Sequence, residues 1–119
     1  MVKELFKSGI YDLLKLIKES EGINPSALEK KLIKKVGMSA NTVYKRINTL
    51  ARLGIINFDF GVSEKGRPAK ICKLTPLGKK IVQHIEEMER EFEDYHRKRS
   101  FPDTVEEFID KELENDNNS

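Results

Sequence analysis

The chain has 119 residues, and 35% of them are charged. This length suits about one domain. No apolar run approaches the roughly 18 residues of a membrane span, the N-terminus lacks the apolar stretch of a secretion signal, and a single cysteine excludes an internal disulfide framework. We therefore expect a soluble, cytoplasmic protein that does not enter a membrane.

The formal net charge of +2 conceals a strong asymmetry along the chain. Residues 1–85 carry 17 Lys and Arg against 7 Asp and Glu, whereas residues 86–119 carry 5 against 13. The two parts therefore have net charges of +10 and −8. Such a division favours a basic part that faces a polyanion and an acidic part with another task. Two merely solvated helix surfaces would give the same sums, so the motifs must decide.

The first predicted helix rests on apolar residues at helical spacing. Leu13 and Leu14 lie between Ile10 and Ile17, and Gly22 is a plausible stop. Leu5 and Phe6 could begin this helix earlier.

Two further helices are predicted close together. One covers residues 25–36, with Asn24 as its N-cap and Gly37 at its end. The next is capped by Ser39, ends at Gly54, and has an apolar stripe of Val43, Ile47 and Leu50. Two helices joined by a tight, glycine-containing turn are typical of the helix-turn-helix motif.

After Gly54 the apolar period changes from that of a helix to that of a strand. In "IINFDFGV", Ile56, Phe58 and Phe60 alternate on one side, and "AKICKL" predicts a second strand. The intervening "SEKGRP" has the glycine and proline of a turn. Thr75 then caps a long helix with proline at its first position.

The long helix has the most regular apolar pattern. From Ile81 onward the spacing alternates between four and three residues, as in a coiled coil. We expect this seam to form a homodimer interface consisting of Ile81, Ile85, Met88, Phe92 and Tyr95. Behind it, Asp103 and Glu106 resemble a capping box of a short terminal helix.

These elements predict a mainly α fold with a small β-hairpin, a winged helix-turn-helix, followed by a long C-terminal dimerisation helix. The expected organisation is a DNA-binding domain over residues 1–76 and the dimerisation and terminal helices over 77–114. Residues 115–119 are expected to be a disordered tail.

The helix after Ser39 carries candidate nucleic-acid contacts opposite its apolar stripe. Amides, lysine and arginine suit base edges and phosphates in a major groove, and the helix contains no acidic residue. A solvated face is the alternative, but such faces usually include glutamate. The candidate contacts are Ser39, Asn41, Thr42, Tyr44, Lys45, Asn48, Thr49 and Arg52.

The turn of the hairpin supplies a second group of basic residues. Gly66 permits a tight turn, Pro68 stiffens it, and Arg67 is expected to point outward to a minor groove, where arginine is favoured. Lys65 and Lys70 are expected to lie against phosphates. A charged solubilising loop is the alternative interpretation.

Two stretches resemble winged-helix regulators of the MarR, ArsR and PadR type. "SANTVYKRINTLARLGII" is similar to their recognition helix and its exit into the wing. "GRPAKICKLTPLGKKI" is similar to the wing tip, the second wing strand and the start of the dimerisation helix. The resemblance covers roughly residues 8–85. It implies a transcriptional regulator that binds double-stranded DNA as a homodimer and is associated with the nucleoid.

Other sites are less well supported. His84 and His96 are twelve residues apart on one helix, which is poor spacing for metal ligands, and Cys72 is expected to pack beside the wing. No catalytic constellation, cofactor motif or effector site is evident, so we expect no enzyme. Two alternative functions remain: an architectural chromatin protein with little sequence preference, and a winged helix used for protein–protein contact.

Overall fold

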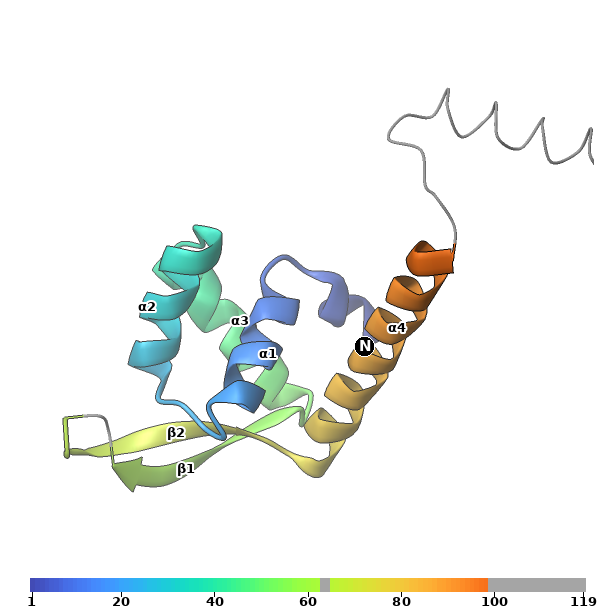
Figure 1. The fold of residues 1–119 in the computed structure, drawn as a ribbon. Helices are drawn as coiled ribbons and strands as arrows, with labels where there is room; N and C mark the ends of the chain where they lie inside the picture. Colours follow the sequence, from blue (N-terminus) through green and yellow to red (C-terminus); the bar gives the residue numbers. More distant parts are fainter. Residues whose placement is uncertain (63–64, 99–119) are drawn as a thin grey trace, which may run out of the picture. The chain divides into compact units, whose positions relative to one another are not determined.

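The computed structural model describes residues 1–62 and 65–98 (Figure 1). The predicted order of helices, hairpin and long helix is confirmed. The elements are η1 (Val2–Phe6), α1 (Ile10–Glu19), α2 (Pro25–Val36), α3 (Ala40–Arg52), β1 (Ile56–Val62), β2 (Pro68–Leu74) and α4 (Pro76–Lys98).

The N-terminal residues do not extend α1. Leu5 and Phe6 belong to the separate 3-10 helix η1, because the chain changes direction at Gly9, whose φ is 82°. A side chain at this position would collide with Met38, which lies directly against Gly9. Glycine therefore serves both the left-handed backbone and the close approach of Met38.

The hairpin pairs antiparallel from Ile56↔Leu74 to Val62↔Pro68. A third segment joins its outer edge: the N–H of Ile23 donates to the carbonyl of Cys72 at 3.1 Å, and the N–H of Cys72 donates to the carbonyl of Ile23 at 2.7 Å. The loop between α1 and α2 is therefore attached to β2. The sequence did not predict this pairing, because the two residues are far apart in the chain.

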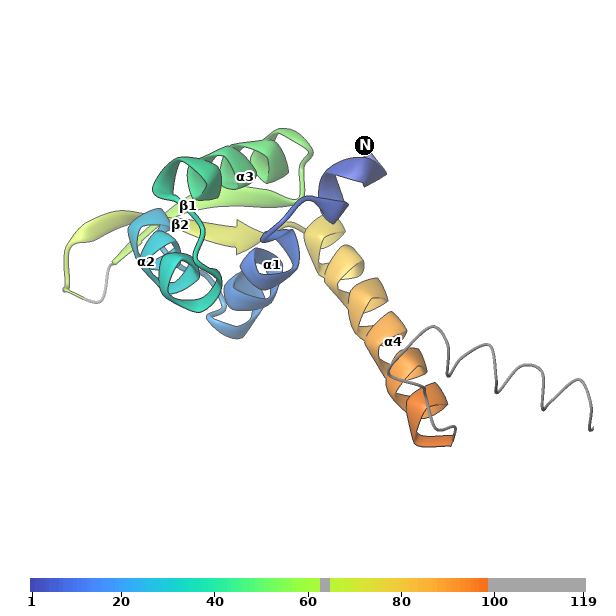
Figure 2. The same cartoon turned by 90° about the horizontal axis from the view of Figure 1, so that it is seen from above.

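The core lies between the three helices and the base of the hairpin. In Figures 1 and 2, α1, α2 and α3 lie on one side of the hairpin, whose tip extends beyond α2. Ile56 and Cys72, which come from the base of the two strands, are buried with the apolar faces of the helices. The buried apolar side chains of these three helices, which Val82 of α4 joins, are Ile10, Leu13, Leu14, Ile17, Leu28, Leu32, Val43, Ile47 and Leu50.

The start of α4 is attached to the end of α3 by a single threonine. The hydroxyl of Thr75 hydrogen-bonds to the carbonyl of Gly54 at 2.6 Å and accepts the N–H of Gly78 at 3.0 Å. The predicted N-cap is therefore confirmed. Gly78 is buried against the backbone carbonyl of Ile55, where a β-carbon would collide.

The chain divides into two compact units, of which the first covers residues 1–84. The described part of the second is the remainder of α4, which ends at Lys98. The terminal helix predicted near Asp103 and the predicted tail at 115–119 lie outside the described residues.

Candidate nucleic-acid interface

Caps locate both helices of the helix-turn-helix, one at the start of α2 and others at its junction with α3. The side chain of Asn24 accepts the N–H of Ala27 at 2.7 Å and begins α2, which ends at Gly37 with φ of 70°. The hydroxyl of Ser39 accepts the N–H of Thr42 at 3.2 Å and begins α3. Both predicted N-caps are confirmed, and they determine where each helix starts.

One side of α3 is buried and the other is open. Val43, Ile47 and Leu50 are at most 2% exposed, as the apolar stripe predicted. On the opposite side the structure places a set of exposed polar and basic side chains, with Thr42 and Thr49 half-buried at its margins. The exposed candidates are Ser39, Asn41, Tyr44, Lys45, Asn48 and Arg52.

Some of these side chains already have partners within the protein. The hydroxyl of Ser39 also hydrogen-bonds to that of Thr42 at 2.9 Å, so both groups take part in the cap. Tyr44 hydrogen-bonds to Glu29 of α2, and this bond is the main reason that the pKa of Tyr44 is raised. Asn41, Lys45 and Asn48 therefore form the centre of the exposed face.

Sequence reasoning missed the role of Arg46. Its Nε donates to the carbonyl of Ser8 at 3.0 Å, which ties α3 to the chain just before α1. This arginine therefore faces away from Asn41, Lys45 and Asn48. Its helical position, one residue beyond Lys45, was the signal that it faces another side.

We define the wing as β1, β2 and their connection. Its basic residues near the tip are exposed to solvent. Lys65, Arg67 and Lys70 are all exposed. The ammonium of Lys70 lies 5.6 Å from the ring centroid of Phe58, in cation–π geometry. The exposed basic groups are thus near the tip of the hairpin, and Lys70 among them lies over an aromatic ring.

Asp59 is the one acidic residue among the described residues of the wing, and its charge is balanced by a neighbouring lysine. The carboxylate of Asp59 accepts the N–H of Phe60 at 2.8 Å and lies 3.4 Å from the ammonium of Lys73. The hydrogen bond from Phe60, followed by that from Lys73, holds the pKa of Asp59 below its ordinary value. Asp59 is therefore charged at neutral pH and paired with a cation.

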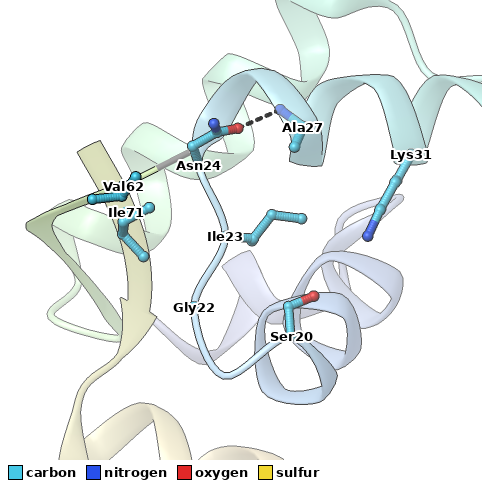
Figure 3. Close-up of a pocket in the computed structure, with 8 residues that line it drawn as sticks. All are labelled: Ser20, Gly22, Ile23, Asn24, Ala27, Lys31, Val62 and Ile71. Atoms are coloured by element: carbon cyan, nitrogen blue, oxygen red, sulfur yellow. Dashed lines mark hydrogen bonds between the residues drawn. The ribbon is translucent and has the colours of Figure 1, made fainter. Parts of the chain in front are cut away.

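A small cavity lies between the wing and the start of α2 (Figure 3). Its volume is about 240 Å³, which is below the roughly 300–1,000 Å³ of typical small-molecule sites. One polar group of its lining, the Oδ1 atom of Asn24, is occupied by the cap of α2. The lining consists of Ser20, Gly22, Ile23, Asn24, Ala27, Lys31, Val62 and Ile71.

The sequence raised two further sites for chemistry, the thiol of Cys72 and a metal site. Cys72 is buried as predicted, and burial raises the pKa of its thiol to about 11. Within residues 1–62 and 65–98, no cluster of His, Cys, Asp and Glu side chains could hold a metal ion. None of the helices in the same ranges is long and apolar enough to cross a membrane.

The predicted dimer seam runs along α4. Ile81 and Ile85 are half-buried. Farther along the helix, Met88 is 50% exposed, Phe92 66% and Tyr95 44%. The apolar seam is therefore half-buried at Ile81 and Ile85 and exposed from Met88 to Tyr95.

No family model and no curated protein matches this chain. Solved structures do. A PadR-like transcription factor from Bacteroides fragilis is similar with a TM-score of 0.59 and 23% identity, over 81% of this chain and 95% of that one. A PadR family transcription regulator from Clostridium difficile has a TM-score of 0.58 and 18% identity, over 76% and 97%. Together with the helix-turn-helix and hairpin described above, these likenesses establish that the chain has the winged-helix fold found in PadR-type structures.

Proposed function

We propose that the protein is a transcriptional regulator that binds double-stranded DNA sequence-specifically as a homodimer. The observation that carries this proposal is the open face of α3, where Asn41, Lys45 and Asn48 are exposed on a helix without any acidic residue. Similar folds in proteins described as transcription regulators support it.

The chemistry of this face suits a major groove. A groove of B-form DNA admits one α-helix, and asparagine can pair with adenine through two hydrogen bonds. Lys45 can contact guanine or a phosphate. The exposed basic residues of the wing would then contact the neighbouring backbone or minor groove, and the protein would associate with the nucleoid.

Substitution of Asn48 tests the role of α3 in sequence recognition. Asn48→Ala should weaken binding to a preferred duplex by about 1–3 kcal/mol and leave binding to a scrambled duplex nearly unchanged. Asn57→Ala, at an exposed position of β1, is the matched control. Equal losses on both duplexes would assign Asn48 to a phosphate and favour an architectural protein without sequence preference.

The homodimer is supported by the exposed apolar seam of α4. Two-fold pairing would cover Met88, Phe92 and Tyr95 and would place two α3 helices about one DNA turn apart. In this organisation residues 1–76 bind DNA and residues 77–114 assemble the dimer.

A double substitution in the seam tests the dimer. Ile85→Asp combined with Met88→Asp should give a folded monomer with much weaker DNA binding, whereas Glu87→Asp in the same turn should leave both properties unchanged. Light scattering at tens of micromolar protein measures the assembly. A monomeric wild-type protein would refute the dimer, and a dimer that survives the double substitution would move the interface elsewhere.

A further inference from the structure

The two faces of the wing differ in chemistry. Residues paired across an antiparallel hairpin share a face, so the register groups Phe58, Phe60 and Val62 with Lys70 and Cys72. The other face carries Asp59, which is paired with Lys73. In the described part of the wing, one face is therefore apolar and basic, and the opposite face carries the acidic residue Asp59.

The apolar face continues beyond the core. At the base of the hairpin its residues Ile56 and Cys72 are buried, but farther along Phe58 is 40% exposed, Phe60 87% and Val62 69%. We call Phe58, Phe60 and Val62 the apolar strip. Single exposed apolar residues are ordinary, but three in succession on one face of a projecting hairpin form a continuous surface.

The strip lies on the side of the hairpin where the helices lie. Because Ile56 and Cys72 point into the core between the sheet and the helices, the strip beyond them faces the same side. β1 starts after the end of α3 and runs back alongside it, so that the tip of the hairpin extends past α2 (Figures 1 and 2). A duplex held by α3 would therefore meet this face of the wing rather than the face of Asp59.

The minor groove of DNA is a suitable partner for such a surface. Its walls are formed by deoxyribose rings, which offer apolar contacts between two rows of phosphates. Proteins that bind there insert apolar side chains, phenylalanine among them. Phe60 would meet the apolar walls, while Lys70, held over Phe58, and Lys65 would meet the phosphates.

We infer that Phe60, supported by Val62, is an apolar minor-groove contact of the wing and contributes to affinity for DNA independently of charge. This inference rests on the proposed function, since it assumes that α3 holds the duplex. The wing would then contact DNA in two ways: its apolar side chains would pack against the minor groove, and its basic residues would make ionic contacts.

The test compares two similarly exposed phenylalanines. Phe60→Ala is measured against Phe6→Ala, because Phe6 of η1 is 81% exposed. The probe is a duplex that the wild-type protein selects from a random-sequence library, and affinity is followed by fluorescence anisotropy over a series of salt concentrations. Phe60→Ala should raise Kd about tenfold, and Phe60→Leu should restore most of the affinity. Phe6→Ala should bind as the wild type does.

Salt dependence separates an apolar contact from an ionic one. Phe60→Ala should leave the slope of log Kd against log salt unchanged, because no counterion is released at an apolar contact, whereas Lys70→Ala should flatten it. Netropsin, which occupies A·T-rich minor grooves, should raise the Kd of the wild type more than that of Phe60→Ala. A flattened slope for Phe60→Ala would overturn the inference.

The remaining outcomes are also decisive. If Asn48→Ala weakens binding while Phe60→Ala behaves like Phe6→Ala, the inference fails and the proposed function stands. If Phe60→Ala changes the oligomeric state in light scattering and not the affinity for DNA, the strip is a protein–protein surface and the inference is again wrong. A wild-type protein that selects no duplex refutes both.

Discussion

Replacing Gly78 by alanine should destabilise the unit of residues 1–84, although alanine is the better helix former. In a helix, alanine is more favourable than glycine by about 1 kcal/mol in free energy. The new β-carbon, however, would collide with the backbone carbonyl of Ile55 and lie 3.2 Å from the side chain of Leu74. Because a backbone carbonyl cannot rotate away as a side chain can, either α4 or the chain at Ile55 must shift.

The shift would also disturb hydrogen bonds. The carbonyl of Ile55 accepts the N–H of Thr75 at 3.0 Å, and the hydroxyl of Thr75 lies 3.1 Å from it. Overpacking costs roughly 1–3 kcal/mol, and each weakened hydrogen bond up to about 1 kcal/mol more. After the gain in propensity is subtracted, we expect a net loss of about 1–3 kcal/mol in the free energy of unfolding.

Urea unfolding followed by far-ultraviolet circular dichroism measures this loss. Protein concentration must be the same for every variant, since a dimer gains stability with concentration. Lys80→Ala, at an exposed position of the same helical turn, is the control and should change stability by less than about 0.5 kcal/mol. If Gly78→Ala proves as stable as the control or more so, α4 does not pack against Ile55 as the structure describes.

Three further predictions concern caps and titrating groups. Asn24→Ala should cost about 1 kcal/mol of stability in the same urea assay, whereas Asn24→Asp should retain most of it; equal losses would deny the cap a role. Cys72 should react with a thiol reagent at pH 8 only as fast as the protein unfolds, because its thiol is buried and its pKa is raised to about 11; rapid labelling of folded protein would contradict this. The pKa of Asp59, measured by NMR titration, should lie below the ordinary value of an aspartate and rise only part of the way in Lys73→Ala, because the hydrogen bond from Phe60 is the larger cause. Since this pKa is lowered by folding, the stabilisation by the carboxylate is present at neutral pH and is lost as pH falls through the folded value.

Local signals predicted the helices well. The start of α2 follows from Asn24 and Pro25 and its end from Gly37, and the predicted range of 25–36 agrees with the structure. Each of these signals acts within one helical turn, so the residues alone suffice to locate the boundary. The start of α3 at the Ser39 cap was predictable for the same reason.

Features that depend on distant residues were not predictable. Nothing near Ile23 indicates that its backbone pairs with Cys72, and nothing near Arg46 indicates that its guanidinium reaches Ser8. The sequence showed that Phe58 and Phe60 alternate on one side of a strand. Periodicity does not show how far the helices cover that side, so the exposure of the apolar strip could not be predicted. The DNA contacts assigned to α3 and the wing, and the seam of α4, remain predictions.

The pairing of Ile23 with Cys72 has a consequence for the order of folding. The hairpin can form early because its strands are neighbours in the chain, but this pairing closes a loop of about fifty residues, which carries a larger entropic cost. It should therefore form late, when α1 and α2 are already docked. Amide hydrogen exchange at Cys72 would then require the whole unit to open, so that a single proton at the base of the wing reports the global stability of the fold.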